Sequence, residues 1–193
     1  NKILITQKVS MALRVGINGF GRIGRNVLRA IIESERKDIE VVAINNRSSL
    51  EVCAHLLKYD SVHGIFPYEI ATSENHLHIG DAKIFVSNEI TIDEIQWRHN
   101  DVDLVMECTG KFNSAKECQK HINSGARKVL ISAPAKDADI TVVYGENEEK
   151  INPNHNIISN ASCTTNCLAP IAKVLNDNFG ITEGFMTTVH SYT

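Results

Sequence analysis

Two cysteines four positions apart, Cys163 and Cys167, are the residues of this chain best suited to chemistry. Cys163 lies between an expected strand end and an expected helix start, where unpaired backbone N–H groups and the helix dipole favour a thiolate over a thiol. Cys167 lies inside the same expected helix, where no comparable field acts, and we expect it to be a small buried apolar residue. The pattern therefore indicates Cys163 as a nucleophile and gives Cys167 no chemistry.

The same cysteine pair is a poor candidate for a metal site. Zinc sites usually combine two such pairs, or one pair with closely spaced histidines, and neither pattern accompanies Cys163 and Cys167. We therefore expect no metal ligands.

A nucleophilic thiol needs a base, and eight histidines compete for that role. His190 ends an expected strand, 185–190, in the unit that Cys163 opens, so one hypothesis places it opposite the thiol, and the other gives it a structural role. We expect most of the other histidines at the surface, and His121 late in a helix, where a positive charge is favourable.

A second chemical signal is the glycine motif Gly19-x-Gly21-x-x-Gly24. It follows an apolar run of strand length, 13–17, and opens a segment with helical spacing. One glycine allows the turn, one allows a pyrophosphate to approach, and one allows the helix to pack on the strand. The context predicts a dinucleotide site of the Rossmann type.

The end of the second expected strand, 39–44, departs from this fingerprint. An Asp or Glu usually binds the adenosine ribose there, but this chain has Asn45, Asn46 and Arg47. A solvent-exposed loop and a functional substitution are both compatible with these residues.

Six apolar runs of strand length must position these groups, and most are separated by helical patterns or polar loops. The runs are 13–17, 39–44, 102–106, 129–132, 140–144 and 156–159. Such alternation predicts an α/β fold with a doubly wound, mostly parallel sheet. We expect 65–86 to be a hairpin excursion from the main sheet, a helix to start at Ser114, and Gly125 to end it with a positive φ.

We place the domain boundary near Ser162, with a dinucleotide-binding domain over 11–162 and the beginning of an α+β catalytic domain over 163–193. The helix expected over 164–179 ends at Gly180 and precedes the strand 185–190. One helix and one strand cannot bury both their apolar faces, so we expect the second domain to be incomplete in these 193 residues.

Charge and composition narrow the class of protein. The chain has 20 Lys and Arg against 23 Asp and Glu, a net charge of -3, so it lacks the basic footprint of nucleic-acid or acidic-membrane binding. No apolar stretch approaches the length of a bilayer span, and no signal peptide is recognisable at the start. An odd number of scattered cysteines suits a reducing compartment. We expect a cytoplasmic protein with a small-molecule partner.

Six segments together resemble the phosphorylating glyceraldehyde-3-phosphate dehydrogenase family, over about 12–193. The segments are 17–25, 58–60, 107–110, 132–134, 159–170 and 187–190. The resemblance implies a glycolytic or gluconeogenic oxidoreductase in which Cys163 attacks the aldehyde, a hydride passes to nicotinamide, and inorganic phosphate releases the thioester as 1,3-bisphosphoglycerate. It implies that His190 activates Cys163, and that the full-length enzyme is a homotetramer.

The resemblance also implies the binding residues. The residues implied to bind the cofactor include Thr109, Gly110 and Ser132. They also include the pyrophosphate loop, which consists of Gly19, Gly21, Arg22, Ile23 and Gly24. Ser162, Thr164 and Thr193 resemble substrate or phosphate contacts. Asn46 stands where the family usually has an Asp that binds NAD and repels the 2′-phosphate of NADP, and the adjacent Arg47 suits that phosphate. We expect NAD as the cofactor with measurable use of NADP.

Two alternatives stay open. The related erythrose-4-phosphate dehydrogenases share the cysteine motif, although 132–134 and 190–192 fit the glyceraldehyde enzymes better. The second alternative is that the chain is a nucleotide-binding module without catalytic activity. Family members continue well beyond this length, with a further anion-binding Arg and most of the second sheet, so we expect these 193 residues alone to be inactive.

Overall fold

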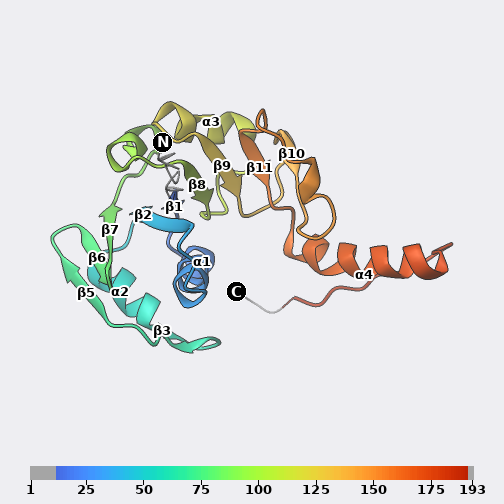
Figure 1. The fold of residues 1–193 in the computed structure, drawn as a ribbon, viewed down its shortest axis with the longest axis horizontal. Coiled ribbons are helices and arrows are strands. Elements are labelled where there is room, and N and C mark those ends of the chain that lie inside the picture. The colour runs from blue at the N-terminus through green and yellow to red at the C-terminus, as the bar shows by residue number, and fades with distance from the viewer. Residues whose placement is uncertain (1–11, 191–193) are drawn as a thin grey trace, which may run out of the picture.

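The computed structural model describes residues 12–190, and a nine-stranded sheet forms its centre (Figure 1). The order in space is β10-β11-β9-β8-β1-β2-β7-β6-β5. The strands are β1 (Leu13–Asn18), β2 (Ile39–Asn45), β5 (Ile70–Ser73), β6 (His76–Ile79), β7 (Ala82–Ser87), β8 (Leu104–Glu107), β9 (Lys128–Ile131), β10 (Ile140–Thr141) and β11 (Ile157–Ser159). All pairs from β10 to β7 are parallel, which confirms the predicted fold class.

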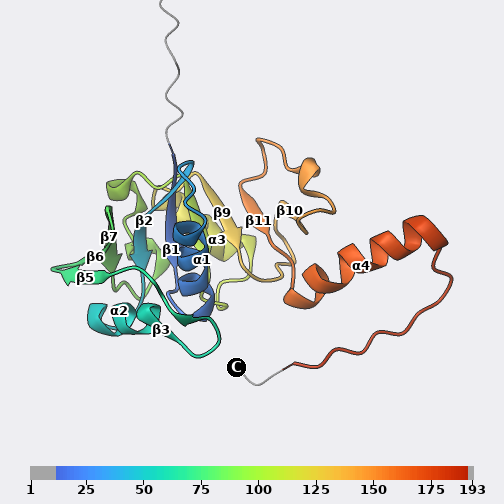
Figure 2. The ribbon, with the colours of Figure 1, turned by 60° about the horizontal axis from the view of Figure 1, so that its bottom comes forward.

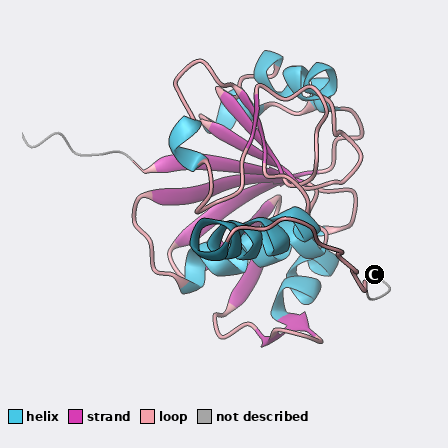
Figure 3. Ribbon diagram, turned by 90° about the vertical axis from the view of Figure 1, so that its right-hand side faces the viewer, coloured by secondary structure: helices cyan, strands magenta, loops and turns pink. Residues whose placement is uncertain are grey.

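Helices cover both faces of this sheet (Figure 3). The covering helices are α1 (Arg22–Glu33), α2 (Leu50–Lys58) and α3 (Ala115–Asn123), with short 3-10 turns η1 (Ile92–Glu94), η2 (Trp97–Asn100) and η3 (Glu148–Lys150). A fourth helix, α4 (Cys163–Phe179), does not cover the sheet. The predicted start of α3 is confirmed, because the Ser114 side chain accepts a hydrogen bond from the Glu117 N–H at 3.3 Å. Gly125 follows this helix with a φ of 116°, as expected.

The period of two along each strand divides the apolar side chains into two cores. Leu104 and Met106 of β8 pack into the core that α1 and α2 cover, whereas Val105 between them packs into the core that α3 and η2 cover. A sheet buried on both faces needs nearly continuous apolar strands, which is the pattern that the sequence has.

The hairpin expected to leave the main sheet is instead its continuation. β7 pairs in parallel with β2, and β6 and β5 follow in antiparallel pairing. Only the small antiparallel pair β3 (Tyr59–Asp60) and β4 (Gly64–Ile65) stands apart from the sheet among residues 12–190. The turn residues of this segment predict a local hairpin, but they do not indicate that β7 also pairs with β2.

Helix α4 extends away from the end of the sheet (Figures 1 and 2). It ends at Gly180, with a φ of 74°, as predicted, but the strand predicted over 185–190 is absent from the described residues. That segment is exposed and has no neighbouring strand with which to form a ladder. The apolar side chains of α4 are exposed as well: Leu168, Ile171, Val174, Leu175 and Phe179. No helix within 12–190 is both long enough and apolar enough to cross a membrane.

Candidate functional site

The carboxyl edge of the parallel sheet carries the candidate site. Each of five parallel strands ends there in a polar residue: Asn18 of β1, Asn45 of β2, Ser87 of β7, Glu107 of β8 and Ser159 of β11. Ligands of open parallel sheets bind outside the carboxyl ends of the strands, at the point where the strand order reverses. Here that point lies between β1 and β8, because the chain continues from β1 to β2 on one side and reaches β8 on the other.

The loop from β1 to α1 leaves no room for side chains at two of its glycines. Gly19 has a φ of 90°, and a Cβ there would lie 2.7 Å from the backbone nitrogen of Thr109. A Cβ on Gly24 would lie 2.3 Å from the Gly19 carbonyl oxygen. By contrast, nothing lies within 4 Å of a Cβ built on Gly21, and no side chain caps α1. The start of α1, with the exposed Arg22 and Ile23, therefore keeps space and N–H groups for an anion.

A cavity of about 320 Å³ opens beside this loop. Its lining brings together five of the residues that the sequence analysis singled out, which are Gly19, Gly21, Asn46, Arg47 and Thr109. Arg22, Ile23, Gly24, Gly110 and Ser132 are not among the lining residues. The size and the mixed polar and apolar walls suit part of a dinucleotide, so the residues present fit the cofactor that the glycine motif predicts.

Asn46 is held firmly at the edge of this cavity. Its Oδ1 accepts a hydrogen bond from the Phe20 N–H at 3.2 Å, and its Nδ2 donates to the sulfur of buried Cys53 at 3.3 Å. The second lone pair of Oδ1 stays available to a ligand hydroxyl. The Asn46 side chain is therefore half-buried and fixed in orientation at the edge of the cavity.

Arg47 is exposed and lines the same cavity. Within the part of the chain that the structure describes, its guanidinium makes no ion pair with an acidic side chain. A cation in this position is free to bind an anionic group of a ligand.

Thr109, Gly110 and Ser132 lie at the neighbouring strand ends. The Thr109 N–H donates to Glu107 Oε1 at 2.8 Å, and Gly110 follows with a φ of 69°. The Ser132 N–H donates to the Glu107 carbonyl oxygen at 3.0 Å, which ties the end of β9 to that of β8. The Ser132 side chain lies beside Cys108, which lines the cavity.

The turn before Cys163 is fixed by two side chains, those of Ser159 and Asn166. Ala161 has a φ of 57°, a left-handed conformation, and its N–H donates to the buried Ser159 hydroxyl at 3.2 Å. The Asn166 side chain donates to the carbonyl oxygens of Asn160 at 2.7 Å and Ser162 at 2.9 Å. These contacts turn the chain from β11 into α4 and place Cys163 at the first position of the helix.

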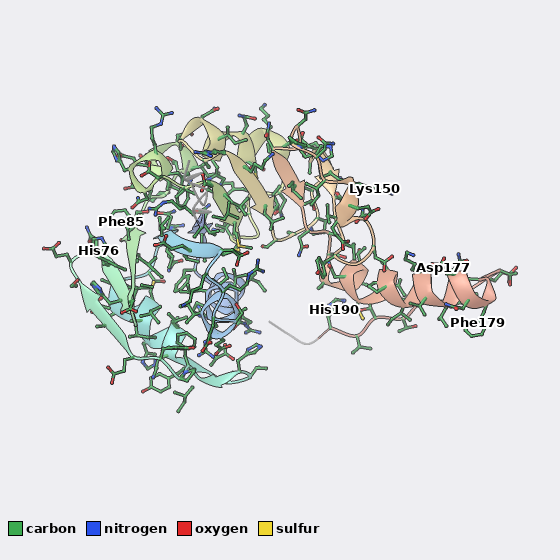
Figure 4. All side chains as sticks on the ribbon, in the orientation of Figure 1. His76, Phe85, Lys150, Asp177, Phe179 and His190 are labelled. Atoms are coloured by element: carbon green, nitrogen blue, oxygen red, sulfur yellow. The ribbon has the colours of Figure 1, made fainter. Side chains whose placement is uncertain are left out.

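Ser162 and Thr164 flank Cys163 in the chain, and His190 lies beside Thr164. The Ser162 hydroxyl caps α4 by accepting from the Thr165 N–H at 2.9 Å. The His190 Nε2 lies 3.4 Å from the Thr164 hydroxyl, although the two residues are 26 positions apart (Figure 4). The same ring nitrogen lies 2.8 Å from the Thr188 hydroxyl, so the imidazole is held between Thr188 and the residue that follows Cys163. Thr193 lies outside the described residues.

The five thiols fall into two groups. Cys53, Cys108 and Cys118 are buried, and burial raises the pKa of each thiol, to about 11 for Cys108 and about 12 for Cys118. Cys163 and Cys167 are exposed. The expectation that Cys167 is buried is wrong for this chain, because nothing in the described residues covers α4.

Sequence reasoning missed the polar residues beneath the cavity. Glu107 and His121 are fully buried, so His121 lies late in α3 as expected but not at the surface. Its ring faces Trp97 and Glu107 instead. One feature of the sequence could have indicated these residues: several apolar strands each end in a polar residue, as β8 does at Glu107.

Comparison with known proteins gives two family matches. The glyceraldehyde 3-phosphate dehydrogenase NAD binding domain matches residues 13–115, and the C-terminal domain of the same family matches residues 162–193.

Curated relatives with more than half of their aligned residues identical are named after the same family. The chain is 55% identical over 183 residues to glyceraldehyde-3-phosphate dehydrogenase of Xanthobacter flavus, a match that covers 95% of this chain and 55% of the relative. It is 54% identical over 184 residues to that of Geobacillus stearothermophilus, covering 95% of this chain and 54% of the relative. The chain thus spans about half the length of the curated relatives that it matches.

Proposed function

The chain belongs to the glyceraldehyde-3-phosphate dehydrogenase family, and from this premise we propose that the protein carrying it converts glyceraldehyde 3-phosphate, phosphate and NAD to 1,3-bisphosphoglycerate and NADH. The observation that supports this most is the position of Cys163. It is an exposed thiol at the start of α4, with His190 beside Thr164, at the sheet edge that also bears the cavity.

The first step is addition of the Cys163 thiol across the aldehyde carbonyl. His190 takes the thiol proton, the sulfur bonds to the carbonyl carbon, and His190 returns the proton to the carbonyl oxygen, which gives a thiohemiacetal and leaves His190 neutral. Backbone N–H groups at the start of α4 stabilise the negative charge that develops on this oxygen.

The second step is oxidation and release. When bound, the cofactor supplies the hydride acceptor. The thiohemiacetal loses a hydride from carbon and its hydroxyl proton to His190, which gives a thioester. A phosphate oxygen then attacks the thioester carbon, and the Cys163 sulfur leaves as a thiolate that takes up the proton of the attacking hydrogen phosphate. His190 releases its proton to solvent. The hydroxyl of Thr164, with Thr193, binds phosphate oxygens in this proposal.

The remaining assignments follow from family membership. Residues 11–162 form the NAD-binding domain, in which the glycine loop, Thr109, Gly110 and Ser132 hold the cofactor, and 163–193 begin the catalytic domain. The full-length protein, by which we mean a polypeptide carrying this chain and the further length of its relatives, is a cytoplasmic homotetramer active in glycolysis and gluconeogenesis.

The test is a coupled assay of the full-length protein with NAD. NADH formation from glyceraldehyde 3-phosphate that depends on added phosphate supports the proposal. A clear preference for erythrose 4-phosphate, or cofactor binding without oxidation of either aldehyde, would overturn it.

The identity of residue 46 sets the choice of cofactor. An Asp accepts from both ribose hydroxyls of NAD and repels the 2′-phosphate of NADP, whereas Asn46 carries no charge and Arg47 beside it is unpaired among residues 12–190. A charged hydrogen bond from Arg47 contributes about 1.5 to 3 kcal/mol. We predict NAD as the working cofactor with measurable NADP activity, and expect Asn46→Asp to lower kcat/KM with NADP at least about tenfold more than with NAD.

Kinetics with both cofactors check this prediction. Arg47→Gln serves as the matched control, because it removes the cation while keeping Asn46, and it should also reduce use of NADP selectively. If the wild-type protein discriminates against NADP as strongly as the Asn46→Asp variant does, the account is contradicted.

We also predict that a polypeptide of these 193 residues cannot turn over. It spans about half the length of its relatives, and the apolar side chains of α4 are exposed, which makes aggregation or capture of a partner favourable. The check is an activity assay on the purified chain, with its length verified by intact mass. Steady turnover by that species would refute the prediction.

A further inference from the structure

Glu107 is a buried carboxyl group that the proposed mechanism does not use. Its side chain is 0% exposed and receives hydrogen bonds on both oxygens. Oε1 accepts from the Thr109 N–H at 2.8 Å and from the Thr109 hydroxyl, and Oε2 accepts from Asn18 Nδ2 at 2.6 Å. A group that accepts this many hydrogen bonds is suited to the ionised form, which is an acceptor only.

His121 adds a further donor without adding a charge. The Trp97 indole N–H, which can only donate, lies 2.9 Å from His121 Nδ1, so Nδ1 is the acceptor. The single ring proton is then on Nε2, which donates to Glu107 Oε2 at 3.0 Å. Trp97 therefore holds His121 in the neutral tautomer that faces the carboxylate.

The negative charge of Glu107 has no cationic partner. Among the described residues 12–190, no Lys or Arg forms an ion pair with it, and its one basic neighbour is the neutral His121. Water does not screen a charge at this depth. Its field reaches Cys108, whose pKa burial raises to about 11, with a further contribution from the Glu107 charge.

This charge lies directly behind the cavity wall. Asn18, Cys108 and Thr109 all line the cavity. Cys108 follows Glu107 in the chain, and Asn18 and Thr109 donate hydrogen bonds to the Glu107 carboxylate. The Asn18 orientation is fixed from the other side as well, because its Oδ1 accepts from Asn45 Nδ2 at 2.9 Å. The carboxylate thus positions one wall of the cavity and projects negative potential into it.

The oxidised nicotinamide ring carries a positive charge and the reduced ring carries none. We propose that Glu107 is a positioning residue whose buried negative charge makes this site favour oxidised over reduced cofactor. This inference rests on the proposed cofactor site and goes beyond it by assigning a redox preference to a residue that the cofactor does not touch.

The expected effect is measurable. For a unit charge roughly 10 Å from the carboxylate, Coulomb's law with an effective dielectric constant of about 20 corresponds to a change of roughly tenfold in a binding constant. Removing the charge should therefore shift the ratio of the dissociation constants for NADH and NAD by about that factor. A purely structural role would weaken both forms alike and leave the ratio unchanged.

The experiment compares Glu107→Gln with Glu107→Asp in the full-length protein. Calorimetric titrations with NAD and with NADH give both dissociation constants without turnover, and circular dichroism verifies folding. Gln keeps the length and loses the charge, so the ratio should shift by about tenfold towards NADH. Asp keeps the charge but shortens the reach to Asn18 and Thr109, so both affinities should fall while the ratio stays within about twofold of the wild type.

Thr109→Val is the matched control, because it removes one donor to Glu107 and leaves the charge in place. It should weaken both cofactor forms without a change of ratio beyond about twofold. An unchanged ratio in folded Glu107→Gln, or a changed ratio in Glu107→Asp, would overturn the inference. If the Gln variant does not fold, Glu107→Met, which also removes the charge, takes its place, and an unchanged ratio in that folded variant would overturn the inference. Failure of the unmodified protein to bind either cofactor would instead refute the proposed function.

Discussion

Replacing Cys163 by Ser in the full-length protein should lower kcat for aldehyde oxidation by roughly 10³-fold or more, because a serine hydroxyl is a far weaker nucleophile than a thiolate. The affinity for NAD should stay within about twofold, since the cavity-lining residues lie at the ends of β1, β2, β7 and β8 and in the segments that follow them, away from α4. Steady-state kinetics and cofactor titration on the same preparation give both quantities.

Cys167→Ser is the matched control for this prediction. The two cysteines are exposed on the same helix, four positions apart, so the two substitutions differ in place and not in chemistry. The control should retain kcat within about twofold. A collapse of turnover in Cys167→Ser with normal turnover in Cys163→Ser would reverse the two assignments.

Replacing His190 by Asn should lower kcat by about 10² to 10⁴-fold, the range that general acid–base catalysis contributes. The physical reason is that Asn cannot take a proton from the thiol or from the thiohemiacetal hydroxyl. Alkylation of Cys163 by iodoacetamide should slow in the same variant, because the thiol then lacks its base. Kinetics and peptide mapping after limited alkylation measure the two effects.

His155 offers the control for this substitution. It is paired with Asn152 in a loop, with 2.9 Å between the Asn152 Nδ2 and the His155 Nε2, and it has no part in the proposed site. His155→Asn should keep kcat and the alkylation rate within about twofold of wild type. Equal losses in both histidine variants would show that the effect of residue 190 is not specific.

The sheet was largely predictable from the sequence because its central strands are buried on both faces. Such strands are apolar almost throughout, as Ile39–Asn45 is, and they alternate with helices that begin at recognisable residues such as Ser114. The hairpin 65–86 was assigned outside the sheet because turn residues define its local shape, whereas the pairing of β7 with β2 depends on contacts distant in sequence.

The candidate site likewise has residues that could be predicted from the sequence and residues that could not. The close packing at Gly19 and Gly24 and the helix start at Cys163 depend on residue type and local spacing, so they could be predicted from the sequence. The buried set of Glu107, His121 and Trp97 was missed because each residue gains its partner only through the fold. A histidine late in a helix has no local feature that distinguishes an exposed cation from a buried acceptor.

The central claim is that Cys163 forms the covalent intermediate of a phosphorylating aldehyde oxidation. The most direct test incubates the full-length protein with glyceraldehyde 3-phosphate and NAD in the absence of phosphate, followed by acid quenching and peptide mass spectrometry. The account predicts a 3-phosphoglyceroyl thioester on Cys163 that disappears when phosphate is added before quenching. An adduct on Cys167 or another residue, or continuous NADH production without phosphate and without any adduct, would contradict it.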